Sequence, residues 1–95
     1  MKNLLNKITS FRDARGWKSH DTPETMAKSI IIEAAELLEN FQWPGQVPDA
    51  ENVKEELADV LIYTLAMIAD MGLDPEQIIE EKLIKNAIKY PEIKE

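Results

Sequence analysis

The sequence predicts an all-α protein with four helices. Apolar residues recur every three or four positions, as on one face of a helix, and no segment alternates between apolar and polar residues as a strand does. Glycine and proline separate the apolar segments and divide the chain into four parts. Neither repeats nor a long linker interrupt the 95 residues, so we expect residues 1–95 to form a single domain.

The first helix is predicted over about residues 3–15. Its larger apolar side chains recur three or four positions apart and share one face: Leu4, Leu5, Ile8 and Phe11. Gly16 follows, and glycine is common just after a helix because it adopts the left-handed backbone conformation without strain. We therefore expect the helix to end there.

The second helix is predicted from Thr22 to about Phe41. Thr22 can cap the free backbone amides of the first turn, and Pro23 suits the first helical position because no amide hydrogen is needed there. Glu24 adds a negative charge where the helix dipole favours one. Three start signals thus coincide.

The third helix is predicted to begin after Asp49, a good N-cap residue, and to end near residues 71–72. Pro44, Gly45 and Pro48 mark the preceding loop. Residues 57–71 are apolar nearly all round, which requires cover on every side of the helix. A chain of this length buries only about 60–65% of its surface, so we expect self-association.

The fourth helix is predicted to start at Asp74 and Pro75, with Gln77 placed for a capping-box contact, and to stop at Pro91. It carries a cluster of basic and amide side chains: Lys82, Lys85, Asn86 and Lys89. Most such clusters are solvated faces. Lysine also suits phosphate, which gives the cluster an alternative role.

Charge and composition exclude several function classes. The formal net charge of −7 argues against binding a nucleic-acid polymer, which needs a basic surface. The absence of cysteine excludes disulfides, thiolate metal sites and a thiol nucleophile.

Neither a signal peptide nor a membrane span is expected. Charged residues interrupt the N-terminal segment at Lys7, Arg12, Asp13 and Arg15. The apolar run of the third helix falls short of about 20 residues and contains Asp59 and Asp70. We therefore expect a cytoplasmic protein that does not enter a membrane.

Two pairs of carboxylates lie within the apolar segments, Glu33 with Glu36 and Glu56 with Asp59. Residues three apart share a helix face, so each pair repels itself unless a cation lies over it. If the two helices are antiparallel neighbours, the four side chains converge, and one or two Mg²⁺ ions, or Mn²⁺ as a substitute, could satisfy them. Acidic residues make up 18 of 95 positions, so an ordinary acidic helix face is the alternative.

Aromatic residues and one histidine are further candidates. Trp17 and Trp43 are predicted in loops that border the second helix, where each either caps the core or stacks on a planar ligand. Tyr63 lies one turn after Asp59, so its hydroxyl points toward the carboxylates or finds a partner in the core. His20 is either a solvated loop residue or a functional one. With a single histidine, the chain lacks the Glu-x-x-His pairs of di-iron bundles, which argues against oxygen activation.

Four motifs follow one another along nearly the whole chain. They are Arg15-Gly16-Trp17 with His20, residues 33–43 (EAAELLENFQW), residues 56–63 (ELADVLIY), and Lys82 with Asn86 and Lys89-Tyr90-Pro91. In this order and spacing the sequence resembles the MazG-like nucleotide pyrophosphohydrolases of the all-α NTP pyrophosphatase superfamily.

The resemblance implies a four-helix bundle-like fold that assembles as a homodimer or homotetramer, with sites formed between subunits. It also implies hydrolysis of a nucleoside triphosphate, with a preference for deoxynucleotides, to a monophosphate and pyrophosphate, as in house-cleaning of the nucleotide pool. The residues that would bind Mg²⁺ are Glu33, Glu36, Glu56 and Asp59. The residues that would contact the substrate are Lys82, Lys85 and Asn86 at the phosphates, and Trp17, His20, Trp43 and Tyr63 around the base and sugar.

In the mechanism that follows, Mg²⁺ neutralises the polyphosphate and activates a water molecule, and one carboxylate accepts the proton. Glu36 is the first choice for that role. A noncatalytic helical module whose acidic face docks a basic partner is the alternative from another class. A phosphoribosyl-ATP pyrophosphatase would use similar carboxylates, although residues 41–43 and 89–91 resemble the MazG group more closely.

Overall fold

The computed structural model describes residues 1–93, so the last two residues of the predicted domain lie outside it. Within this range every regular element is helical and no strand is present, which confirms the all-α class. The α-helices are α1 (Lys2–Ala14), α2 (Pro23–Leu38), α3 (Ala50–Asp70) and α4 (Pro75–Lys89). Two 3₁₀ turns, η1 (Lys18–His20) and η2 (Glu39–Phe41), follow α1 and α2.

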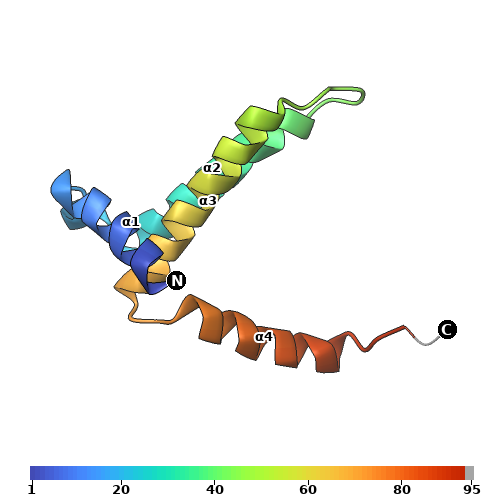
Figure 1. The fold of residues 1–95 in the computed structure, drawn as a ribbon. Coiled ribbons are helices and arrows are strands. Elements are labelled where there is room, and N and C mark those ends of the chain that lie inside the picture. The colour runs from blue at the N-terminus through green and yellow to red at the C-terminus, as the bar shows by residue number, and fades with distance from the viewer. Residues whose placement is uncertain (94–95) are drawn as a thin grey trace.

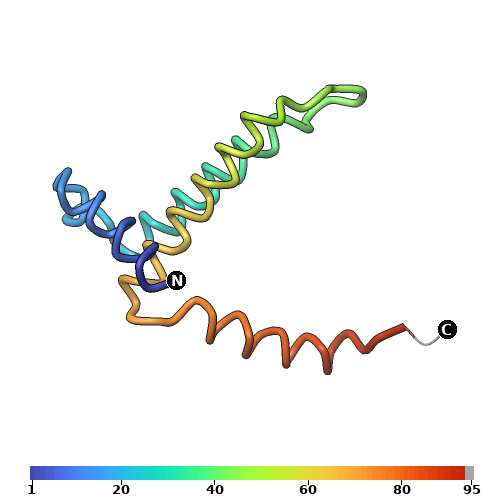
Figure 2. Tube along the Cα trace, in the orientation of Figure 1, coloured from blue at the N-terminus to red at the C-terminus, as the bar shows by residue number. Residues whose placement is uncertain are grey.

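Helices α2 and α3 form an antiparallel pair, and α1 packs against α3 near the end of the pair that lies opposite the α2–α3 loop (Figure 1). Helix α4 leaves the end of α3 and points away from the pair, with sparse contacts to the rest of the described chain (Figure 2). The radius of gyration is 16.4 Å. A compact domain of this length would have a radius of roughly 12 Å, so the chain is extended.

The core is small and lies where α2 and α3 approach α1. Met26 of α2 and Leu65 and Ala66 of α3 are buried. Many larger apolar side chains are exposed instead, including Leu61 (57%) and Ile84 (65%). The prediction that the third helix needs cover on every side is therefore met only in part by the described residues of one chain.

The predicted start signals of α2 and α3 are confirmed. The hydroxyl of Thr22 accepts a hydrogen bond from the backbone N–H of Thr25 at 3.2 Å, and the hydroxyl of Thr25 accepts one from the N–H of Thr22 at 2.8 Å. Asp49 accepts from the backbone amides of Glu51 and Asn52. Both helices begin where the sequence predicts because these side chains satisfy amides that have no partner within the helix.

The predicted capping box at the start of α4 is wrong. Asp74 caps the helix alone, by accepting a hydrogen bond from the backbone N–H of Glu76. The side-chain amide of Gln77 instead donates to Glu81 Oε1 at 3.0 Å, one turn further along the helix. The pairing of residues four apart on an exposed face thus competes with the contact back to the cap.

A pair of asparagines joins η2, the turn that follows α2, to α3 near the loop between the two helices. The amide of the buried Asn40 donates to Asn52 Oδ1 at 2.8 Å and lies 3.3 Å from the carbonyl oxygen of Leu37. A buried amide without a partner is costly, so this contact favours one alignment of the two helices. None of the helices in residues 1–93 combines the length and apolar character needed to cross a membrane.

Candidate metal centre and adjoining cavity

Three carboxylates meet between α2 and α3. Each of Glu33, Glu56 and Asp59 offers one oxygen atom, and the three atoms lie within 4.8 Å of one another. Because α2 and α3 are antiparallel neighbours, one helix face of each turns toward the same point, as the spacing of the residues predicts.

Two of these carboxylates carry a buried oxygen without a partner. Within residues 1–93, Glu33 Oε2 and Glu56 Oε2 are buried and form no hydrogen bond. Buried polar atoms in native proteins are nearly always satisfied, so each exception needs an explanation. A bound cation would supply the missing partner.

The electrostatics of the cluster agree with that explanation. Burial, then hydrogen bonding to Glu36 and its negative charge, and then the charges of Asp59 and Glu56, raise the pKa of Glu33 to about 7. Burial and Glu36 are also the leading causes that raise the pKa of Glu56. Like charges this close disfavour full ionisation unless an opposite charge lies among them.

The chemistry of the ligand atoms fits a hard divalent cation. The group of three offers carboxylate oxygens alone, and Mg²⁺, Mn²⁺ and Ca²⁺ prefer oxygen ligands. Glu36 lies within hydrogen-bonding reach of both Glu33 and Glu56 but outside the group of three. All four predicted carboxylates thus lie together, and Glu36 lies beside the group of three rather than within it.

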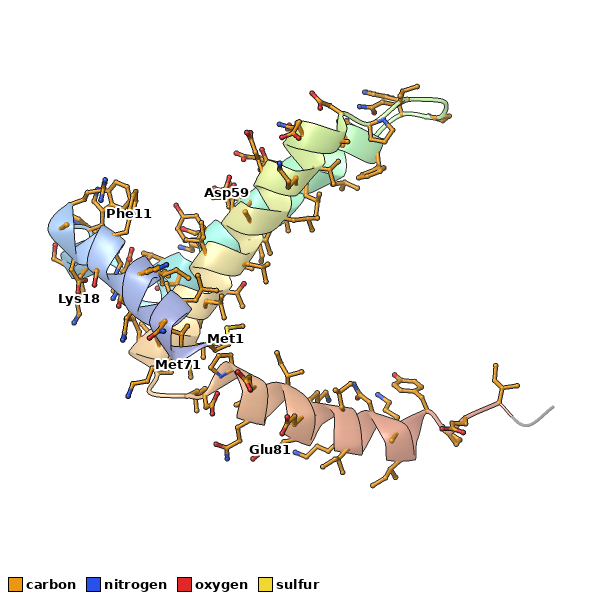
Figure 3. All side chains as sticks on the ribbon, in the orientation of Figure 1. Met1, Phe11, Lys18, Asp59, Met71 and Glu81 are labelled. Atoms are coloured by element: carbon orange, nitrogen blue, oxygen red, sulfur yellow. The ribbon has the colours of Figure 1, made fainter. Side chains whose placement is uncertain are left out.

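A cavity of about 670 Å³ adjoins the carboxylates. Asp59 forms part of its wall, together with three of the residues predicted to surround a base and sugar, Trp17, His20 and Tyr63. Figure 3 shows Phe11 of α1 and Asp59 of α3 on the two sides of the angle between these helices. The volume lies within the usual range for small-molecule sites.

Aromatic rings define much of this cavity. The rings of Phe11 and Trp17 meet edge to face with centroids 5.9 Å apart, and Trp17 is half exposed. A half-exposed indole supported on one edge can stack a planar ligand on its free face. Burial, followed by the charges of Glu33, Asp21 and Asp59, raises the pKa of Tyr63. Its hydroxyl therefore stays protonated near neutral pH and can donate a hydrogen bond.

Comparison with known proteins assigns the family. The sequence profile of the MazG-like family matches residues 28–95, a segment that contains all four carboxylates and α4. The chain belongs to the MazG-like family. This result confirms the resemblance inferred from the motifs.

Two kinds of relative resemble the MazG-like chain over most of its length. It is 33% identical to dCTP pyrophosphatase 1 of Mus musculus and 31% identical to that of Homo sapiens, each over 96% of this chain. The chain spans 59% of the length of these curated relatives. A crystal structure of a pyrophosphatase from Archaeoglobus fulgidus superposes with a TM-score of 0.85 and 40% identity, over 97% of this chain and 93% of the other.

Four predicted substrate-binding residues of the MazG-like chain lie elsewhere. Within the described residues, the cavity is not lined by Trp43, Lys82, Lys85 or Asn86. Trp43 follows η2 in the α2–α3 loop and is 66% exposed. The other three belong to α4, which points away from α2 and α3 (Figure 1). One described chain therefore does not bring these residues to its own carboxylates.

The cavity also includes residues that the sequence analysis does not single out. Those with polar groups are Lys7, Arg12, Asp21 and Ser29. A signal exists for Ser29, which precedes Glu33 by four residues and so shares its helix face. The others come from α1 and the segment before α2, whose position relative to α3 has no signature in the sequence.

Proposed function

We propose that this protein is a Mg²⁺-dependent nucleoside triphosphate pyrophosphohydrolase that cleaves between the α and β phosphates. The observation that carries the proposal is a carboxylate cluster beside an aromatic-lined cavity, with two buried oxygens that have no hydrogen-bond partner among residues 1–93. The relatives named dCTP pyrophosphatase and pyrophosphatase support the same reaction class. Mn²⁺ is expected to substitute for Mg²⁺, since both accept oxygen ligands.

Each carboxylate has a role in this proposal. Glu33, Glu56 and Asp59 would hold the cation. When bound, Mg²⁺ would neutralise charge on the polyphosphate and make a water molecule more acidic. Glu36 would complete the ligand set and accept the proton of the attacking water at a carboxylate oxygen, because it lies beside Glu33 and Glu56. Water would add to the α phosphorus as the bond to pyrophosphate breaks.

The nucleoside would occupy the cavity. Trp17 would stack on the base, while His20 and the hydroxyl of Tyr63 would contact base or sugar. A deoxynucleoside triphosphate is the favoured substrate, because the curated relatives are named for dCTP. Removal of unwanted nucleotides from the pool would be the role in the cell, and a cytoplasmic location stays a prediction from the sequence.

A homodimer or homotetramer would complete the site. Ile84 and Leu61 are exposed on α4 and α3, and such apolar surface favours association. In an assembly, α4 of a second copy could bring Lys82, Lys85 and Asn86 to the phosphates, and residues 1–95 would act as a single domain. The opposite charges of the lysines and of the carboxylate cluster support this arrangement.

The deciding experiment measures pyrophosphate release from ribo- and deoxynucleoside triphosphates with Mg²⁺. We expect Glu56→Gln to lower kcat by at least about a hundredfold, because a ligand for the cation is lost, and EDTA to abolish turnover. Glu55→Gln is the matched control, since Glu55 is the exposed neighbour on the same helix.

Two outcomes would contradict the proposal. Full activity of Glu56→Gln would show that this cluster does not bind the cation that the reaction needs. A folded wild-type protein that neither hydrolyses any nucleotide nor gains thermal stability from Mg²⁺ would support the noncatalytic interaction module, because a ligand that binds only the native state must stabilise it.

A further inference from the structure

Arg12 is a buried charge that belongs to none of the roles above. Its side chain is only 7% exposed. Nη1 and Nη2 donate to the two carboxylate oxygens of Asp70 at 2.6 and 2.8 Å, which is the bidentate geometry that an arginine and a carboxylate form best. The pair joins the last turn of α1 to the last residue of α3.

The same residue holds the segment that leads into α2. Nη1 of Arg12 lies 3.6 Å from Asp21 Oδ2, just after η1. The carbonyl oxygen of Arg12 accepts a hydrogen bond from the backbone N–H of Trp17 at 3.2 Å. Arg12 therefore contacts both ends of the segment 17–21, once through its side chain and once through its backbone.

Segment 17–21 forms a wall of the cavity. Trp17, His20 and Asp21 all line it, and Asp59 and Tyr63 line it from α3. Asp70 follows Asp59 by eleven residues, about three turns, so Arg12 binds the same face of α3 that carries these two residues. The ion pair between Arg12 and Asp70 thus connects segment 17–21, on one side of the cavity, to α3 on the other side.

Arg12 is not free to bind phosphate. Besides Asp70 and Asp21, its Nε donates to Asp13 Oδ1 at 3.4 Å, so three carboxylates surround the guanidinium. A planar guanidinium with three carboxylate partners is suited to fixing the positions of the segments that carry them. Contact with a mobile polyanion would require these bonds to break.

We propose that Arg12 is a positioning residue that, through Asp70, sets the place of Trp17 and His20 and so determines affinity for the nucleoside. The proposal rests on the proposed function for its substrate. It predicts an effect on nucleotide binding that is separate from cation binding and from proton transfer at the carboxylates.

The test compares Arg12→Lys with wild type in steady-state kinetics with the deoxynucleotide that wild type hydrolyses best. Lysine keeps the charge but loses the bidentate fork. We expect KM to rise about tenfold, the loss of roughly one strong contact, with kcat within about twofold and the stabilisation by Mg²⁺ unchanged. Asp70→Asn is a second variant in case Arg12→Lys does not fold, and the double variant should be no worse than either single one. Lys28→Gln, which removes the exposed ion pair with Glu24, is the matched control.

A spectroscopic readout reports on the segment itself. The chain contains two tryptophans, so ¹⁵N-labelled protein gives two indole N–H signals, which Trp43→Phe assigns. We expect Arg12→Lys to shift or broaden the Trp17 signal and leave the Trp43 signal in place. An unchanged Trp17 signal, or a fall in kcat at constant KM, would overturn the proposal. If wild type hydrolyses no nucleotide, the proposed function fails by itself, and the Trp17 signal still decides whether Arg12 holds the segment.

Discussion

Glu33 holds a carboxyl group in surroundings that disfavour its charge. The side chain is half-buried, one oxygen has no partner within residues 1–93, and three other carboxylates act on it. A cation removes the conflict, because it binds the ionised form of every member at once. The same residue would therefore weaken the metal-free protein and, in the proposed function, bind the ion in the loaded one.

The stability of the metal-free protein should depend on pH in a direction set by Glu33. Its pKa rises from an ordinary value of 4.5 to about 7 on folding, so the native state binds this proton more tightly than the unfolded state. Stability then falls as pH rises from about 4.5 to about 7 and is level above that range, because ionisation becomes costly in the native state alone.

Urea unfolding in EDTA at several pH values checks this prediction. The comparison is with Glu33→Gln, which cannot ionise at that position and should show a smaller fall in stability between pH 4.5 and 7 than wild type, since the raised pKa of Glu56 still contributes. Titrating groups away from the cluster contribute equally to both proteins, so the difference reports Glu33 together with its coupling to the neighbouring carboxylates. A difference that is flat with pH would show that the native pKa of Glu33 is ordinary.

At the scale of elements, the alignment of α2 with α3 brings the carboxylates together. Glu33 and the pair Glu56 and Asp59 come from different helices, so a shift of one helix along the other would separate their oxygens. The contact between Asn40 and Asn52 lies near the loop and resists such a shift, since no other alignment within the pair gives the buried amide this partner.

Asn52→Ala should destabilise the protein by about 1–3 kcal/mol, the usual cost of a buried polar group that loses its partner. Asn40, which is 7% exposed, would retain only its longer contact with the carbonyl oxygen of Leu37. Chemical denaturation measures the change, and Asn6→Ala on the exposed part of α1 is the control. Equal stability of the two variants would mean that the asparagine contact does not hold the pair.

At the scale of the whole molecule, the extended shape supports the proposed association of copies of the chain. Helix α4 carries exposed apolar residues such as Leu83, Ile84 and Ile88 while it has only sparse contacts with the rest of the described chain. An amphipathic helix gains most of its stability from packing its apolar face. In an assembly that face would be covered.

Ile84→Glu should therefore shift the protein toward the monomer, because a charge at a packed apolar position is costly. Sedimentation velocity over a range of protein concentrations measures the distribution, with wild type expected as a dimer or tetramer. Lys28→Gln on α2 is the control for charge alone, because it changes the net charge by the same one negative unit at an exposed position away from α4. If wild type sediments as a monomer at every concentration, the proposed assembly is contradicted.

The sequence predicted more of the local structure than of the site. Helix starts at Thr22 and Asp49 depend on a cap and the amides that follow it, so a few neighbouring residues decide them. The start of α4 was predicted correctly at Asp74, yet the partner of Gln77 was not, because two contacts of similar energy compete on an exposed surface.

By itself the sequence determined the all-α class, the order of the helices and the carboxylates that share a face, since each depends on spacing within one segment. Only the tertiary structure decided that Glu36 stands beside the group of three, that Arg12 and Asp21 join Trp17 at the cavity, and that α4 lies apart from its own carboxylates. These features depend on how helices distant in the chain pack together. Spacing within a helix carries no information about that packing.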